Sequence, residues 1–137
     1  LQIVELFQSL NRAKDLVLYA CISAYPVSFN DLCLLEVRRL KERYGNLIHA
    51  IGFSGHHNGI SMDMGAYTLG ATVIERHFTL DRTWKGTDHA ASLEPDGLRR
   101  LNRDLQQLHE ALRYKEKDLL DIEVAQRNKL KWNRNIS

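Results

Sequence analysis

Apolar residues along the chain follow two spacings that take turns. Helical spacing covers residues 1–10, 32–44, 62–69 and 95–113, and near-continuous apolar runs typical of buried parallel strands cover residues 16–22, 47–53 and 71–78. Pro95 favours the start of the last helix, while Gly45 and Gly70 favour the ends of the two helices before it. Strands that alternate with helices predict a parallel sheet with right-handed crossovers.

Chain length limits how much of a fold this pattern can complete. The chain has 137 residues, of which 44% are apolar and 26% charged, as in soluble globular proteins. A whole (β/α)8 barrel needs about 250 residues, so the sheet is expected to need further strands. A small open α/β domain of the receiver type is disfavoured, because the acidic cluster expected after its first strand is missing. Residues 115–137 are interpreted as a charged tail or linker, partly helical and then extended.

Charge and cysteine content narrow the possible partners. The net charge of +2 gives no reason to expect a nucleic-acid partner, and the short basic stretch 127–134 is interpreted as a solvated tail. No apolar stretch is long enough for a membrane span, and the first residues lack a signal-peptide pattern. Cys21 and Cys33 lack the spacing of a zinc site and are predicted to be buried thiols. Buried thiols favour a reducing, cytoplasmic compartment.

Histidines gather where two of the predicted strands end. His56 and His57 follow the second strand, and His77 closes the third. Neighbouring strands lie about 4.8 Å apart, so one histidine from each could reach a common ion. Neutral imidazole binds Mn, Fe, Co, Ni and Zn, and two histidines leave positions open for water and substrate. Hydrogen-bonded structural histidines are the alternative interpretation.

Other polar residues near the same strand ends could take part in chemistry. Glu75 lies two residues before His77, so both side chains share one face of the strand. Tyr25, before a proline, could bind substrate through its hydroxyl or pack at the rim. The loop after the third strand carries three carboxylates that could orient a histidine, act as acid or base, or be solvated, namely Asp81, Asp88 and Glu94. Metalloprotease, P-loop, dinucleotide-binding and nucleophile-elbow motifs are absent from the sequence.

Several segments resemble the sialic acid synthase family, which includes N-acetylneuraminate synthase and the synthases of legionaminic and other nonulosonic acids. The segments are SAYP (23–26), GFSGH (52–56), GATVIERHFTLDR (70–82), GTDH (86–89) and ASLEP (91–95), in the family's order and spacing. The resemblance implies the C-terminal portion of a (β/α)8 TIM barrel, with about three βα units over residues 1–114. Residues 115–137 would lead toward an antifreeze-like domain that the chain lacks.

The resemblance also implies an activity. The family condenses phosphoenolpyruvate with an N-acetylated hexosamine such as N-acetylmannosamine, releases phosphate and depends on a metal. By motif position, His56 and His77 are the metal ligands, with Mn²⁺ expected and Mg²⁺ or Co²⁺ as alternatives. Tyr25, Ser54 and Asp88 fall on substrate-binding positions, and Asp88 and Glu75 on catalytic ones. The metal would polarise the sugar aldehyde for attack by carbon 3 of phosphoenolpyruvate, after which water adds and phosphate leaves.

The chain departs from the family pattern at several positions. Gly55 stands where the family commonly has aspartate, so a carboxylate beside the metal ligands is missing, and His57 stands where threonine is usual. Residues 83–87 replace a proline-rich approach to Asp88. The family's first half, with a catalytic glutamate and most phosphoenolpyruvate contacts, is missing, so a homodimer or association with the missing half-barrel is expected. The alternative function is a truncated, non-catalytic half-barrel that binds metal or sugar and self-associates.

Overall fold

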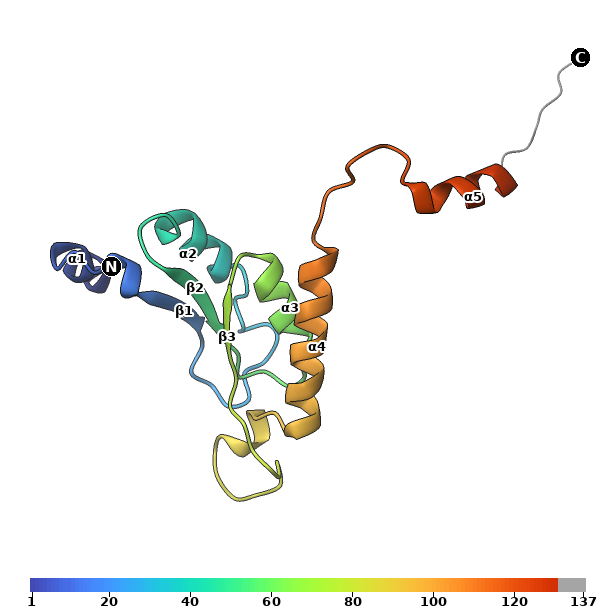
Figure 1. Ribbon diagram of the computed structural model, residues 1–137. Coiled ribbons are helices and arrows are strands. Elements are labelled where there is room, and N and C mark those ends of the chain that lie inside the picture. The colour runs from blue at the N-terminus through green and yellow to red at the C-terminus, as the bar shows by residue number, and fades with distance from the viewer. Residues whose placement is uncertain (131–137) are drawn as a thin grey trace, which may run out of the picture.

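The computed structural model describes residues 1–130, which form one parallel sheet and its helices. The strands are β1 (Val17–Cys21), β2 (Ala50–Ser54) and β3 (Val73–Glu75), in the order β1-β2-β3. The helices are α1 (Gln2–Ser9), α2 (Glu36–Tyr44), α3 (Ser61–Thr68), α4 (Pro95–Ala111) and α5 (Asp121–Leu130), with short 3-10 helices at Ala13–Asp15 and His89–Ala91. The predicted parallel α/β order is therefore confirmed, and α5 lies apart from the sheet (Figure 1).

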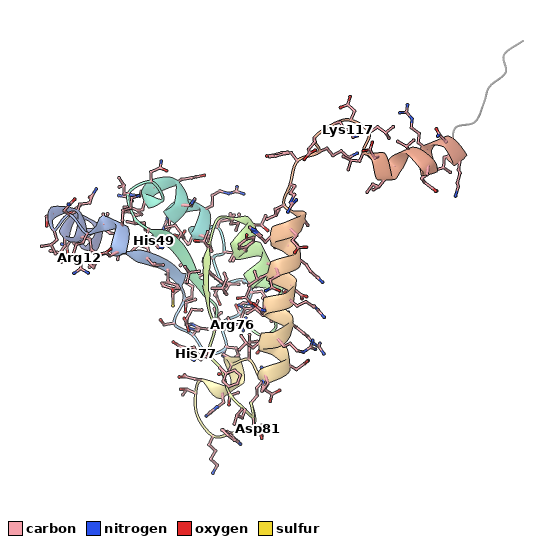
Figure 2. All side chains as sticks on the ribbon, in the orientation of Figure 1. Arg12, His49, Arg76, His77, Asp81 and Lys117 are labelled. Atoms are coloured by element: carbon pink, nitrogen blue, oxygen red, sulfur yellow. The ribbon has the colours of Figure 1, made fainter. Side chains whose placement is uncertain are left out.

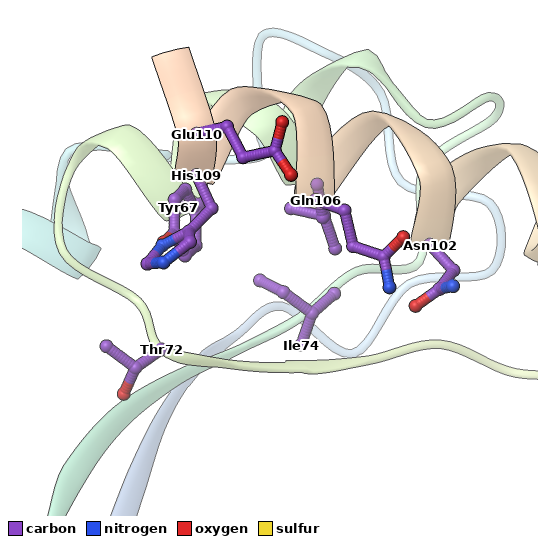
Figure 3. Close-up of a pocket in the computed structure, with 8 residues that line it drawn as sticks. Tyr67, Thr72, Ile74, Asn102, Gln106, His109 and Glu110 are labelled. Carbon is purple, nitrogen blue, oxygen red and sulfur yellow. The ribbon is translucent and has the colours of Figure 1, made fainter. Parts of the chain in front are cut away.

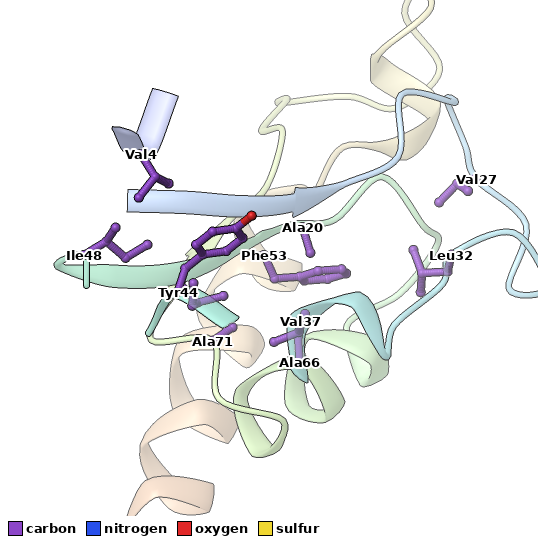
Figure 4. Packing of buried hydrophobic residues seen from close by; sticks show 11 residues of the cluster. Val4, Ala20, Val27, Leu32, Val37, Tyr44, Ile48, Phe53, Ala66 and Ala71 are labelled. Atoms are coloured by element: carbon purple, nitrogen blue, oxygen red, sulfur yellow. The ribbon is translucent and has the colours of Figure 1, made fainter. Parts of the chain in front are cut away.

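The hydrophobic core lies between one face of the sheet and the helices. Ala20 of β1 and Phe53 of β2 pack with Val37 of α2 and Ala66 of α3 (Figure 4). Side chains alternate between faces along a strand, so these residues define the helix-facing side. Burial of a side chain the size of Phe53 stabilises the fold by about 2–3 kcal/mol.

Within the described part of the chain, the other face of the sheet is largely uncovered. Tyr19 of β1 remains 41% exposed, and Cys21 is also exposed. Tyr19, Gly52 and Val73 are in register across the strands. A Cβ on Gly52 would lie 2.5 Å from the Tyr19 ring, so the glycine makes room for that ring across β2. The prediction that residues 16–22 are buried on both faces is therefore wrong for β1.

The two cysteines correct a second prediction. Cys21 and Cys33 were expected to be buried, and both are exposed. Cys21 follows buried Ala20 and so lies on the opposite, uncovered face. Cys33 lies in the loop before α2 with a φ of 48°. The expectation of a reducing compartment therefore loses the burial on which it was based.

Predicted and observed elements differ mainly at their ends. α2 begins at Glu36 instead of residue 32, because the left-handed backbone of Cys33 interrupts the helix. β3 ends at Glu75, and Phe78 forms only an isolated bridge with Leu93. No helix within residues 1–130 is long and apolar enough to cross a membrane. The last residues of the predicted basic stretch and linker, 131–137, lie outside the described residues.

Candidate metal centre

The carboxyl ends of the three strands bring together Tyr25, His56 and His77. The ring centroids of the histidine pair (His56 and His77) are 5.0 Å apart. The Tyr25 ring lies 4.3 Å from the His56 ring and 5.4 Å from the His77 ring. Val27 N donates to the His56 carbonyl at 3.0 Å, which ties the loop after β1 to the loop after β2. Figure 2 shows His77 far along the sheet from His49, which precedes β2.

A backbone carbonyl fixes the ring of His56, which is 3% exposed. His56 Nδ1 lies 2.8 Å from the carbonyl oxygen of Ile22. Because a carbonyl can only accept, Nδ1 carries a proton and donates it. The lone pair of the neutral ring is then at Nε2. Metal-binding histidines commonly have one ring nitrogen held in this way by a carbonyl or carboxylate.

Ser54 and Glu75 form a polar row beneath the histidine pair. The Ser54 hydroxyl donates to Glu75 Oε2, and Ser54 Oγ lies 3.3 Å from His56 Nε2. A hydroxyl has one proton, and here the carboxylate accepts it. Ser54 therefore has no proton left to donate to His56, and the Nε2 lone pair stays available to an electron-pair acceptor. Ser54 thus gives the Glu75 carboxylate a polar partner on this face of the sheet.

The three candidate carboxylates of the loop after β3 have different surroundings. Asp88 Oδ2 lies 3.7 Å from His77 Nδ1, beyond hydrogen-bond length, and the Asp88 side chain is 55% exposed. Asp81 accepts from the hydroxyl and amide of Thr83 at 2.7 and 2.8 Å, and these bonds lower the pKa of the Asp81 carboxyl. Glu94 accepts from Arg82 N at 3.1 Å. Asp81 and Glu94 thus stabilise the loop, whereas Asp88 lies beside the histidine pair.

His57 and Arg76, the neighbours of His56 and His77 in the chain, have side chains that lie on the helix-facing side of the sheet, with Asp63 of α3. His57 and Asp63 have fully buried side chains, and that of Arg76 is 2% exposed. Arg76 Nη1 donates to Asp63 Oδ2 at 2.6 Å and to the Gly59 carbonyl at 2.8 Å, while Nη2 donates to the His57 carbonyl at 2.8 Å. We call these three side chains the Arg76 cluster. His57, a possible ligand by sequence, lies in it, and sequence motifs did not point to a role for Asp63 or Arg76.

The described residues offer an incomplete metal shell. Among residues 1–130, no group of three or more His, Cys, Asp or Glu side chains is placed to hold a metal ion. The histidine pair, with the free lone pair of His56, fits an ion whose other positions are filled by water or substrate. A pocket of about 680 Å³ between β3 and α4, lined by residues such as Ile74 and His109, lies on the helix-facing side of β3 (Figure 3). It is therefore separate from the histidine pair.

Comparison with known sequences decides the family. Residues 2–117 match the NeuB family. The chain belongs to the NeuB family. It is 40% identical over 129 residues to N-acetylneuraminate-9-phosphate synthase of Homo sapiens, covering 94% of this chain and 35% of that protein. It is 38% identical over 101 residues to N,N'-diacetyllegionaminic acid synthase of Campylobacter jejuni, covering 74% of this chain and 29% of that protein.

Solved structures agree with the NeuB assignment. A crystal structure of N-acetylneuraminic acid (sialic acid) synthetase from Leptospira borgpetersenii, in complex with citrate, matches with a TM-score of 0.74 and 30% identity. The match covers 94% of this chain and 45% of that one. The predicted resemblance and the α/β fold are confirmed, and part of a TIM barrel is consistent with both. This NeuB chain spans about a third of the length of the curated relatives above.

The NeuB chain's departure at Gly55 can be placed in space. A Cβ on Gly55 would lie 3.0 Å from the ring of His57 and 3.1 Å from Cδ of Arg76. A side chain at this position would therefore point toward the Arg76 cluster, away from the histidine pair. Asp63 supplies a carboxylate to the same arginine from α3. Gly55 provides no carboxylate near Arg76, and Asp63 provides one from α3 instead.

Proposed function

We propose that this chain forms the metal-binding part of a nonulosonic acid synthase, a transferase that condenses phosphoenolpyruvate with an N-acetylated hexosamine such as N-acetylmannosamine. The observation that carries the proposal is the histidine pair at the carboxyl edge of parallel strands, where barrel enzymes have their active sites. Relatives named as synthases of N-acetylneuraminate phosphate and diacetyllegionaminic acid support this product class.

The histidine pair would hold the divalent metal, with Mn²⁺ as the expected ion and Mg²⁺ or Co²⁺ as alternatives. His56 would bind through Nε2, because its Nδ1 proton is donated to the Ile22 carbonyl. When bound, such an ion supplies Lewis-acid polarisation of the sugar aldehyde. Ser54 stays beside His56 Nε2 because Glu75 accepts its hydroxyl proton.

Tyr25, Asp88 and Glu75 have surroundings that suit roles toward the sugar and its protons. Tyr25 packs against both imidazoles and is 39% exposed, so its hydroxyl can meet a sugar at the rim. In the condensation, carbon 3 of phosphoenolpyruvate bonds to the aldehyde carbon, whose oxygen gains a proton. The water that adds to carbon 2 loses both protons as the bond from carbon 2 to the phosphate oxygen breaks, so that one proton balances the new hydroxyl and the other leaves with phosphate. Asp88 and Glu75 are carboxylates that can accept or donate these protons.

Mn²⁺ titration calorimetry with elemental analysis tests the metal site. Wild type is expected to bind about one ion per chain, and the double variant His56→Ala with His77→Ala to bind at least about 100-fold more weakly, because both imidazole ligands are lost. His49→Ala is the control, because His49 is exposed and precedes β2 at the opposite edge of the sheet. Binding that survives the double variant, or no binding by wild type, would contradict the proposal.

A non-catalytic half-barrel that self-associates stays the alternative function. The uncovered sheet face, with Tyr19 and Glu75 exposed, favours association with another polypeptide. Phosphate release from phosphoenolpyruvate and N-acetylmannosamine, measured alongside size exclusion, separates the two functions. Release supports the synthase, whereas Mn²⁺ binding without release in an oligomeric peak supports the alternative.

A further inference from the structure

We infer that Arg76 is a positioning residue for the histidine pair and that Asp63 holds it in place from α3. This inference rests on the proposed metal site and deepens it. Arg76 directly precedes His77, just beyond the end of β3. Its side chain bonds to Asp63 of α3, while the His77 ring lies against that of His56. Arg76 therefore acts on the histidine pair indirectly, through backbone carbonyls on the helix-facing side, and not by contact with substrate or metal.

The guanidinium joins the segments that carry the two histidines. Its Nη2 donates to the carbonyl of His57, the residue that follows His56, and its Nη1 donates to the carbonyl of Gly59. Both distances are 2.8 Å. A guanidinium presents its donors in a rigid planar fork. The guanidinium, together with the bond from Gly55 N to the Glu75 carbonyl at 3.1 Å, therefore holds the loop after β2 against the end of β3.

Asp63 keeps this fork in place by neutralising it. A buried cation needs a buried partner, and Asp63 Oδ2 lies 2.6 Å from Arg76 Nη1. Arg76 Nε, Asp63 Oδ1 and His57 Nδ1 have no hydrogen-bond partner among residues 1–130. A buried ion pair that leaves polar atoms unpaired adds little to stability compared with apolar packing. This favours a role in fixing geometry.

The surroundings of Gly55 support the same assignment. Without a Cβ, Gly55 leaves room for Phe53, His57 and the Cδ atom of Arg76, all within 3.1 Å of where that Cβ would lie. A carboxylate at residue 55 would approach Arg76 from the β2 side, and Asp63 approaches it from α3 instead. The structure thus retains a carboxylate on this arginine although residue 55 supplies none.

Substitutions at Arg76 test the inference against a matched arginine at the surface. Arg82 also spans the two loops, because it donates to Asn58 Oδ1 at 2.8 Å and to the Ala90 carbonyl at 3.2 Å, but it is exposed. Arg76→Met is expected to weaken Mn²⁺ binding by about 10–100-fold, the usual effect of losing support behind a metal ligand. Arg76→Lys should recover part of this loss, and Arg82→Met should change the affinity less than about threefold.

A metal-free measurement separates failure of this inference from failure of the metal site. If wild type binds Mn²⁺, a folded Arg76→Met variant with unchanged affinity overturns the positioning role. If wild type binds no Mn²⁺, the proposed metal site is wrong. Nuclear Overhauser effects between the Tyr25 and His77 rings then test the positioning role of Arg76 without metal. These should weaken in Arg76→Met and persist in Arg82→Met, and unchanged effects in Arg76→Met overturn the inference.

Asp63→Asn covers the case in which Arg76→Met does not fold. The amide keeps the shape of Asp63 and an acceptor for Arg76 but removes the charge. We expect Mn²⁺ binding about tenfold weaker than wild type, or weaker Tyr25–His77 effects if wild type binds no metal. An Asp63→Asn variant identical to wild type in the deciding measurement overturns the inference.

Discussion

His56 and His57 are adjacent in sequence but have opposite surroundings. His56 faces His77 and Tyr25, and its Nε2 lone pair is free. His57 is fully buried, with Nε2 3.4 Å from both Asp63 Oδ2 and Arg76 Nη1. One step along the chain thus separates a side chain that faces the candidate metal centre from one that is buried against Asp63 and Arg76. Variants on the inner side, where His56 and His77 lie, should therefore lose metal affinity with little loss of stability. Variants on the outer side, in the Arg76 cluster, should lose stability, and those of Arg76 and Asp63 should lose metal affinity as well.

The largest expected effect is the loss of Asp63. Asp63→Ala leaves the buried Arg76 cation without its partner, which should lower the free energy of unfolding by about 3–5 kcal/mol. His77→Ala, on the inner side, should lower it by less than about 1 kcal/mol, because the ring is partly exposed. Urea denaturation followed by circular dichroism measures both.

Asp96→Ala is the matched control for that prediction. Asp96 also pairs with arginines, Arg99 and Arg100, but all three side chains are exposed. Solvent screens such a pair, so its loss should lower the urea midpoint far less than Asp63→Ala does, although Asp96 lies in the first turn of α4, where the helix dipole favours a carboxylate. Equal destabilisation by Asp63→Ala and Asp96→Ala would contradict the prediction that the buried ion pair of Asp63 matters more for stability than the exposed pairs of Asp96.

The second largest loss of stability is expected from His57→Ala. His57→Ala removes a buried ring beside Phe53 and should cost about 2 kcal/mol of stability through the cavity left behind. Mn²⁺ affinity should stay within about threefold of wild type, because Arg76 bonds the backbone carbonyl of His57, which alanine retains. Calorimetry on His57→Ala and His56→Ala measures the contrast. Loss of binding in His57→Ala with retention in His56→Ala would exchange the roles assigned to the two histidines.

The inner site could be anticipated from sequence because its residues follow a local rule. Strand alternation places Glu75 and His77 on one face, and parallel strands end at one edge, so their last residues meet. The order of helices and strands was predictable for the same reason. Strand ends were less predictable, since β3 stops at Glu75 and pairing resumes only at Phe78. The exposure of Cys21 depends on what covers the second face, which local pattern does not specify.

The Arg76 cluster needed tertiary information. Asp63 lies in α3 and Arg76 lies 13 residues later, just beyond β3, so no sequence spacing pairs them. A weaker signal was available. If Glu75 faces inward, Arg76 must face the apolar helix layer, where a cation needs a carboxylate. Asp63, flanked by Met62 and Met64 on a helix of mostly small and apolar residues, is the carboxylate that α3 offers that layer.

The smallest expected effect lies at Asp81, in the loop that carries Asp88. The pKa of Asp81 is lowered from its ordinary value of 3.8 because its carboxylate accepts from the Thr83 hydroxyl and amide. A lowered folded pKa means that ionised Asp81 stabilises the loop above about pH 4, and that this contribution is lost as pH falls through the folded pKa. Thr83→Val removes the hydroxyl donor and should raise the pKa of Asp81 toward 3.8, as measured by carbon NMR titration.

Mn²⁺ affinity at neutral pH should not change in Thr83→Val, because Asp81 is ionised there with or without the hydroxyl. This control tests whether a change in the loop after β3 affects Mn²⁺ binding by the histidine pair. A weaker Mn²⁺ affinity in Thr83→Val would show that the turn at Asp81 helps to place Asp88 beside His77. The inner side would then depend on an exposed support from the loop in addition to the buried support from Arg76. An unshifted Asp81 titration in the same variant would instead remove the Thr83 hydroxyl as the cause of the lowered pKa.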